Sequence, residues 1–142
     1  MYHPVYNNEI NQHVSPLMNN ILLIAIGGAF GSVMRYLMSN AVYSLVGRNF
    51  PYGTLAVNVL GSFIMGFLFI LFLERFATMA DSLRALFLIG VLGGFTTFSS
   101  FSIETFNLFE GGQMVLGCLN ILGSVGICLA ATALGVLLGK QL

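Results

Sequence analysis

The sequence predicts an all-α integral membrane protein with four transmembrane helices. Hydrophobic residues make up 57% of the 142 residues and charged residues only 7%, whereas about a quarter of the residues in a soluble domain are charged. Four apolar segments lie at about Asn20–Leu45, Tyr52–Phe72, Leu83–Phe109 and Met114–Leu138. Each segment reaches the roughly 20 residues that a helix needs to cross a bilayer. The short loops between the segments leave no room for a soluble domain.

The first apolar segment is preceded by a polar N-terminal stretch, residues 1–18. It is rich in Asn, contains Pro4 and Pro16, and has no Lys or Arg. A secretory signal needs a positively charged start and a transit peptide needs Arg, so neither is indicated. We expect a disordered tail over residues 1–18, with Met18 as a possible alternative start. The transmembrane domain then covers residues 19–142.

The few charged residues give almost no preference for one membrane orientation. Four spans place Arg75, Arg84 and Lys140 on one side, and Arg35 and Arg48 on the other. Positive charge normally collects on the cytoplasmic side, and three against two is a weak bias. Two interpretations stay open: a single weakly specified topology, or insertion in both orientations followed by assembly as an antiparallel dimer.

Small residues recur at four-residue spacing in the first and fourth segments. Gly27 and Gly31 form one such pair, and Ala131, Gly135 and Gly139 repeat the spacing. Lipid supplies no hydrophobic drive for helix association, so small side chains are used to bring backbones close together. The pattern predicts helix packing and says little about function.

The third segment contains a stretch that is unusual for the middle of a membrane span, Gly90–Ser102. Gly93-Gly94 has poor helix propensity, and Phe95-Thr96-Thr97 offers hydroxyls that can cap a restarted helix. The pattern predicts a break in the third helix near Gly93–Thr97. A break frees backbone carbonyls that can coordinate a hard cation. The alternative is a kinked helix in which the glycines serve only packing.

Polar residues also form stripes in the second and fourth segments. Four-residue spacing places the members of each stripe on one helix face. The stripes are Thr54, Asn58 and Ser62 in the second segment, and Asn120, Ser124, Cys128 and Thr132 in the fourth. Because a helix carbonyl cannot fully satisfy an Asn amide, we expect Asn58 to line a polar path or to make an essential helix contact. Two stripes that face each other would form a pathway, whereas a single stripe would only join helices.

The residues after the predicted break combine aromatic rings with hydroxyls. Phe98 and Phe101 share a helix face, and Ser99, Ser100 and Ser102 alternate with them. The positive edge of a phenyl ring can face an anion, although such a pair more often contacts lipid or core.

Two charged residues also lie inside spans. Arg35 is costly there unless it snorkels, pairs or faces a cavity. Two roles stay open for it: to hold the fold, or to raise the local concentration of anions at a pore mouth. We assign no role to Glu104.

Three motifs in this order resemble those of the Fluc/CrcB fluoride channels. They are Gly27–Tyr36, Gly53–Phe63 and Gly90–Ser102, and the resemblance covers about Asn19–Leu142. It implies a fluoride-selective channel in the cell membrane that exports cytoplasmic fluoride by passive conduction and so protects the cell. It also implies an antiparallel, dual-topology dimer with two pores and a structural sodium ion at its centre. The dimer would form from two copies or with a homologous subunit.

The resemblance also implies site residues. Asn58 would line the pore, Phe98 and Phe101 would present ring edges to fluoride, and Arg35 would lie at the vestibule. The hydroxyls around the rings would come from Thr97, Ser99, Ser100, Ser102 and Ser124. The carbonyls of Gly93 and Thr96 would hold sodium.

The chain departs from the family at two positions. Ser100 stands where the family often has Thr, which keeps the hydroxyl, and Asn120 stands where many relatives have Tyr. The role of Asn120 is therefore less well defined than that of Ser124.

Other functions fit the residues less well. A small four-helix exporter of cationic drugs needs a carboxylate in its first helix, and Ala25–Tyr43 has none. A membrane scaffold without transport of its own remains a second alternative. The sequence carries no nucleophile–base pair and no ATP-binding loop, so neither an enzyme nor a primary pump is supported.

Overall fold

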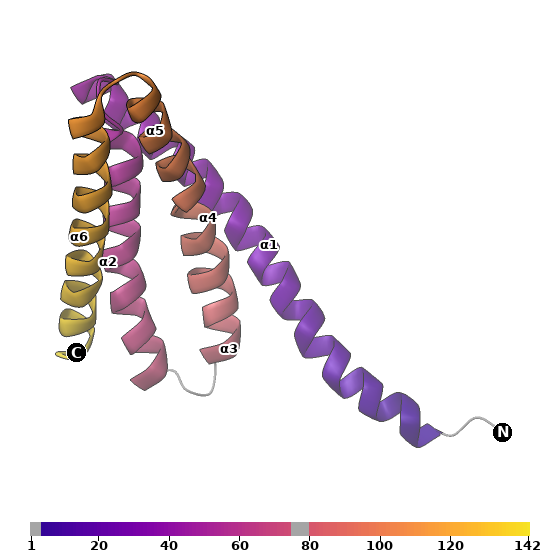
Figure 1. Ribbon diagram of the computed structural model, residues 1–142. Coiled ribbons are helices and arrows are strands. Elements are labelled where there is room, and N and C mark those ends of the chain that lie inside the picture. The colour runs from indigo at the N-terminus through magenta and orange to yellow at the C-terminus, as the bar shows by residue number, and fades with distance from the viewer. Residues whose placement is uncertain (1–3, 75–79) are drawn as a thin grey trace.

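The computed structural model describes residues 4–74 and 80–142, with side chains for residues 17–74 and 81–142. This part of the chain is all-helical (Figure 1). Its elements are α1 (Pro4–Val46), α2 (Tyr52–Glu74), α3 (Ala80–Leu83), η1 (Arg84–Leu92), α4 (Gly93–Phe95), α5 (Phe98–Glu110) and α6 (Met114–Gly139). Four stretches are long and apolar enough to cross a membrane: Leu17–Val46, Tyr52–Glu74, Asp81–Glu110 and Met114–Gly139. The prediction of four spans is confirmed.

The first helix is longer than the span that the sequence predicts. α1 continues back to Pro4, so the backbone of the polar stretch is helical where a disordered tail is expected. The division of the chain into a tail and a transmembrane domain at residue 18 stays a prediction. Residues 1–3 lie outside the described residues, as does Arg75 of the second loop. α1 runs obliquely across the bundle, and its N-terminal half lies away from α2 and α6 (Figure 1).

The third span is built from four elements, and its helix breaks at Thr96–Thr97. Thr96 has φ −78° and ψ 158°, and Thr97 has φ −153° and ψ 118°, so both residues are extended. The Oγ1 atom of Thr97 accepts the N–H of Ser100 at 3.1 Å and so caps α5. The predicted break is confirmed, with Thr97 as the cap, while Gly93 and Gly94 themselves stay helical.

The N-terminal part of the third span has an unexpected winding. Residues Arg84–Leu92 form a π-helix, η1, in which each turn holds more residues than an α-helical turn. The apolar sequence of this segment contains no signal that distinguishes it from an ordinary transmembrane helix.

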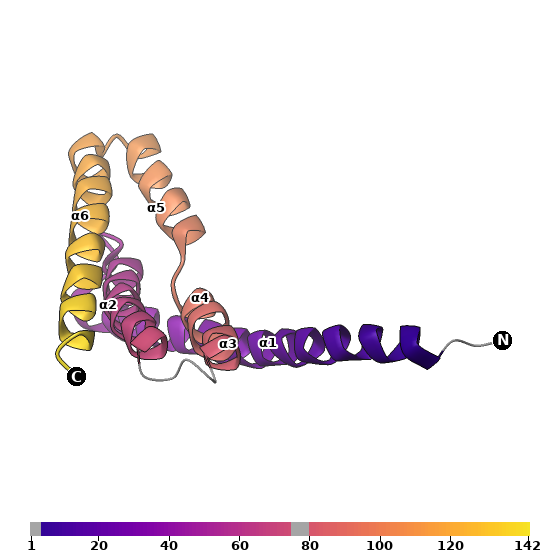
Figure 2. The same ribbon diagram turned by 90° about the horizontal axis from the view of Figure 1, so that it is seen from below.

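The break lets the two halves of the third span pack against different helices. η1 and α4 lie along α1, whereas α5 packs against the N-terminal part of α6. Viewed from below, the chain leaves α4, turns, and continues as α5 in a new direction (Figure 2). A straight helix would stay beside α1 over its whole length. The break therefore opens a space between α2, α5 and α6.

Glycines allow α1 to approach the third span closely. A Cβ atom on Gly27 would lie 2.5 Å from the carbonyl oxygen of Leu86, and one on Gly31 would overlap the carbonyl oxygen of Val91. On the other side, a Cβ on Gly94 would lie 2.6 Å from the carbonyl oxygen of Gly28. Backbone faces backbone along this crossing, as the spacing of Gly27 and Gly31 predicts.

A second close contact joins α2 and α6. A Cβ on Gly66 would overlap the carbonyl oxygen of Thr132, and one on Gly135 would overlap that of Phe63. Gly139 lies in the same seam, where its Cβ would come within 3.0 Å of the carbonyl oxygen of Phe67. The small residues of the fourth span therefore serve helix packing, as predicted.

The crossing of α1 with the third span gives a test with a matched control. Gly31→Ala should destabilise the protein by about 1–3 kcal/mol, because the added methyl meets the Val91 carbonyl and forces the helices apart. Gly28→Ala is the control, since its Cβ would have its nearest neighbour at 3.9 Å. The measurement is the temperature at which the detergent-solubilised protein loses its monodisperse elution peak. Equal temperatures for the two variants would contradict this account of the crossing.

Candidate functional site at the helix break

Asn58 on α2 holds the break in the third span. The N–H of Thr97 donates to Asn58 Oδ1 at 2.8 Å, and Asn58 Nδ2 donates to the carbonyl oxygen of Thr97 at 2.9 Å. The side chain thus pairs with both polar groups of one residue, as a neighbouring strand would. An unpaired peptide group at this depth costs several kcal/mol. Asn58 makes the helix contact that the sequence left as one of two possibilities.

Because of these contacts, two backbone carbonyls lack the N–H donors that they would have in a continuous helix. In an unbroken helix the N–H of Thr97 would pair with Gly93, and the N–H of Ser100 with Thr96. Here these groups donate instead to Asn58 Oδ1 and to Thr97 Oγ1, at 2.8 and 3.1 Å. The carbonyls of Gly93 and Thr96 therefore lose their usual partners. These are the two carbonyls to which the family resemblance assigns a sodium ion.

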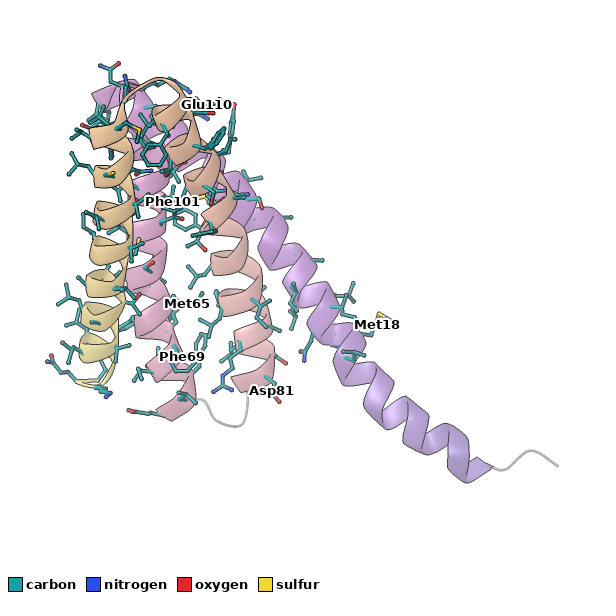
Figure 3. The ribbon with its side chains drawn as sticks, in the orientation of Figure 1. Met18, Met65, Phe69, Asp81, Phe101 and Glu110 are labelled. Atoms are coloured by element: carbon teal, nitrogen blue, oxygen red, sulfur yellow. The ribbon has the colours of Figure 1, made fainter. Side chains whose placement is uncertain are left out.

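A groove of about 280 Å³ runs past the break between α2, α5 and α6. Its lining residues are Asn58, Gly61, Ser62, Met65, Thr96, Thr97, Phe98, Phe101, Ser124, Val125, Cys128 and Thr132. Members of both polar stripes face each other across it, which is the arrangement that would make a pathway. Phe101 on α5 and Met65 on α2 both line this groove, and Figure 3 shows them at different levels of the bundle. No lining residue in the described part of the chain is charged.

Five of the eight predicted pathway residues line this groove. They are Asn58, Thr97, Phe98, Phe101 and Ser124. The rings of Phe98 and Phe101 lie 5.4 Å apart at 45°. Phe98 is 77% exposed, so most of its ring faces outward from the subunit.

The other three predicted residues do not line the groove. The hydroxyls of Ser99 and Ser100 lie 3.2 and 3.1 Å from Thr97 Oγ1, where they surround the cap. Ser102 donates to the carbonyl oxygen of Phe98 at 2.9 Å and lies on the exposed side of α5. Within the subunit these serines support the restarted helix. Their role in an ion pathway stays a prediction.

A hydrogen-bonded chain joins α6 to α5 behind the groove. Ser124 donates to Asn120 Oδ1 at 3.2 Å, Asn120 Nδ2 donates to Thr105 Oγ1 at 2.7 Å, and Thr105 donates to the carbonyl of Phe101 at 2.7 Å. Sequence reasoning missed Thr105. Its spacing of four from Phe101 was the available signal, because Ser and Thr often bond the carbonyl four residues earlier.

Glu104 joins three spans near the end of the membrane-crossing segment. Its Oε1 atom accepts from Thr54 Oγ1 at 2.8 Å and from the hydroxyl of Tyr43 at 3.1 Å. Its Oε2 atom is buried and has no hydrogen-bond partner among the described residues. The sequence assigned no role to Glu104 and did not single out Tyr43. Only the tertiary fold brings these residues, 61 positions apart, into contact.

A second groove, of about 490 Å³, opens at the end of the bundle that carries the first and third loops. Its lining residues are Tyr43, Arg48, Asn49, Phe50, Pro51, Glu104, Asn107, Leu108 and Gln113. Arg48 donates to Asn40 Oδ1 at 3.2 Å and lies 4.8 Å from the centre of the Tyr43 ring. Arg35 lines neither groove, so its placement at a vestibule stays a prediction.

Removal of one donor to Glu104 should weaken the contact between the spans. We expect Tyr43→Phe and Thr54→Val each to lower stability by about 1–3 kcal/mol, because the partly buried Oε1 atom of Glu104 loses a hydrogen bond. Tyr36→Phe, at a 69% exposed position of the same helix, is the control. The measurement is the temperature at which the detergent-solubilised protein loses its monodisperse elution peak. Stability equal to that of the control would mean that Glu104 does not join these spans.

Comparison with known proteins identifies the family of the chain. The family model described as "CrcB-like protein, Camphor Resistance (CrcB)" matches residues 22–136. A protein named "Fluoride-specific ion channel FluC" from Coxiella burnetii (strain CbuK_Q154) is 55% identical over 123 residues, which are 87% of this chain and 99% of that protein. Proteins of the same name from Magnetococcus marinus and Geobacter sulfurreducens are 53% and 50% identical, over 84% and 88% of this chain and 97% and 100% of their own lengths. The chain belongs to the CrcB-like protein family.

Proposed function

We propose that the chain is a subunit of a fluoride-selective channel that lets cytoplasmic fluoride leave the cell passively and so limits its toxicity. The observation that carries this proposal is the uncharged, mainly apolar groove at the helix break, into which α2, α5 and α6 place a few polar side chains and two phenylalanine rings. The names of the similar proteins from Coxiella burnetii, Magnetococcus marinus and Geobacter sulfurreducens specify the ion.

The groove offers what a small, strongly hydrated anion needs. Of the two hydrogens on Asn58 Nδ2, one bonds Thr97 and the other remains for a ligand. Phe101 supplies a ring whose edge is positive, and Ser124 supplies a hydroxyl. α5 also begins at this depth, with the positive end of its dipole and first-turn N–H groups. Without a fixed positive charge, such a site binds an anion weakly enough to release it.

The outward side of the break supports an antiparallel dimer. Phe98 is 77% exposed, and Ser99 and Ser102 beside it are exposed at the middle of a span. Polar groups at this depth need protein or a water-filled path around them. A second copy in the opposite orientation, or a homologous subunit, would cover this surface. The weak charge bias of the sequence permits insertion in both orientations.

A structural sodium ion fits the carbonyls that the break releases. The carbonyls of Gly93 and Thr96 have lost their helical donors to Asn58 and Thr97. Hard cations prefer oxygen ligands of this kind. Two carbonyls are too few for one cation, so we infer that an opposite subunit supplies a second pair. The ion would then hold the two breaks together and take no part in conduction.

We place Arg35 at the entrance of the pathway. A vestibule position would let its charge raise the local concentration of fluoride. Ser99, Ser100 and Ser102 would then belong to the part of the pathway that the second subunit completes.

Purified protein in liposomes loaded with fluoride tests the proposed function. We expect rapid fluoride efflux when potassium and valinomycin remove the electrical barrier, because the hydrogen-bond donors and ring edges that line the groove replace the water around the ion. A fluoride electrode measures the rate, and liposomes loaded with chloride provide the selectivity control. If a monodisperse preparation shows no efflux above that of empty liposomes, the chain is not a channel and a scaffold role gains support.

The two rings give a sharper test of the pathway. Phe101→Ile and Phe98→Ile should each lower the efflux rate by about tenfold or more, because an aliphatic side chain offers the anion no positive edge. Phe106→Ile, at a 54% exposed position of the same helix, should retain the wild-type rate. All three variants are compared by efflux and by elution profile. Wild-type efflux from Phe101→Ile would show that this ring only packs.

A further inference from the structure

The hydrogen-bonded chain behind the groove carries a further inference, which rests on the proposed function. We call this chain the α5–α6 relay, and it consists of Ser124, Asn120, Thr105 and the carbonyl of Phe101. It begins at a groove-lining hydroxyl and ends on the backbone of a groove-lining ring. The residue at its centre, Asn120, does not line the groove and is only 2% exposed.

The relay provides an acceptor for the hydroxyl hydrogens of Ser124 and Thr105. A hydroxyl has a single hydrogen, and that of Ser124 is donated to Asn120 Oδ1, away from the groove. Ser124 itself is 7% exposed, so little water is present to compete for this hydrogen. At rest the groove therefore meets the lone pairs of the Ser124 oxygen. An anion can bind this hydroxyl only if the hydrogen turns away from Asn120.

We propose that Asn120 is a positioning residue that regulates anion binding at Ser124. Its amide oxygen competes with the passing anion for the Ser124 hydrogen. When the anion arrives, the hydroxyl rotates and donates to it, and when the anion leaves, the hydrogen returns to Asn120 Oδ1. No proton is transferred at any stage, and only one hydrogen bond is exchanged for another.

The length of the bond suits such an exchange. Hydroxyl hydrogen bonds to oxygen usually measure about 2.5–3.0 Å, and the Ser124–Asn120 bond measures 3.2 Å. A bond at this length is readily displaced by a charged acceptor, which forms a stronger one. The competition weakens anion binding without abolishing it. Weak binding is what rapid conduction requires.

The two hydrogen bonds of Asn120 distinguish its positioning role from a purely structural one. The bond from Asn120 to Thr105 joins two helices, whereas the bond from Ser124 to Asn120 lies within α6 and joins none. Loss of the first bond should affect stability. Loss of the second should affect the affinity for the anion.

The test is the single-channel current at a series of fluoride concentrations. Asn120→Leu should lower the half-saturating fluoride concentration by about threefold, because Ser124 no longer has a competing acceptor. The maximal current should fall as well, since a more tightly held ion leaves more slowly. Asn120→Ala carries the same expectation if the leucine variant does not fold. Asn19→Leu, at an exposed position of α1, is the control and should match the wild type.

Two further variants show whether the effect passes through Ser124. In a Ser124→Ala background, Asn120→Leu should cause no further change in the half-saturating concentration. Thr105→Val should lower thermal stability as Asn120→Leu does, yet keep the wild-type half-saturating concentration. An Asn120→Leu effect that persists without the Ser124 hydroxyl, or no effect in a conducting protein, overturns the inference. A wild-type protein that conducts no fluoride overturns the proposed function itself.

Discussion

The pairing of Asn58 with Thr97 is the interaction on which the rest of the structure depends. A helix can be interrupted inside a membrane only if the peptide groups at the interruption find other partners. Asn58 supplies both partners for Thr97, and the Thr97 hydroxyl supplies one for Ser100. Through these contacts α5 can leave α1 and turn toward α6, and the carbonyls of Gly93 and Thr96 lose their helical donors. The groove, the exposed ring of Phe98 and the proposed ion sites all follow from this change of direction.

Close glycine contacts provide the rigid frame around the break. α1 is held against η1 and α4, and α2 is held against α6, in both cases with backbone meeting backbone. The break lies between these two pairs, so its polar groups are positioned by both. Hydrogen-bonded networks at Glu104 and at Asn120 then connect α5 to the remaining spans. A pathway of few polar groups can keep its geometry because the helices that carry it cannot separate without loss of these contacts.

Much of this fold could be predicted from the sequence, because lipid imposes simple rules. The length of the apolar segments predicted the four spans. Gly93-Gly94 followed by two threonines predicted the break in the third helix and its cap. Contacts between distant positions were harder to predict. The spacing of Thr54, Asn58 and Ser62 gave a polar face but not the reciprocal pairing of Asn58 with Thr97. The contact of Tyr43 with Glu104 and the π-helical winding of Arg84–Leu92 arise from tertiary packing, for which the local sequence carries no pattern.

Amide hydrogen exchange across Gly90–Ser102 tests most directly whether Asn58 holds the break. The comparison is between the wild type, Asn58→Leu and Ser62→Ala, which changes another residue of the same groove. Loss of two hydrogen bonds should make exchange in this segment faster by about tenfold or more in Asn58→Leu. The seam between α2 and α6 should exchange at its wild-type rate in all three proteins. Wild-type or slower exchange in Asn58→Leu would contradict the account, because it would mean that the break persists, or closes into a continuous helix, without this side chain.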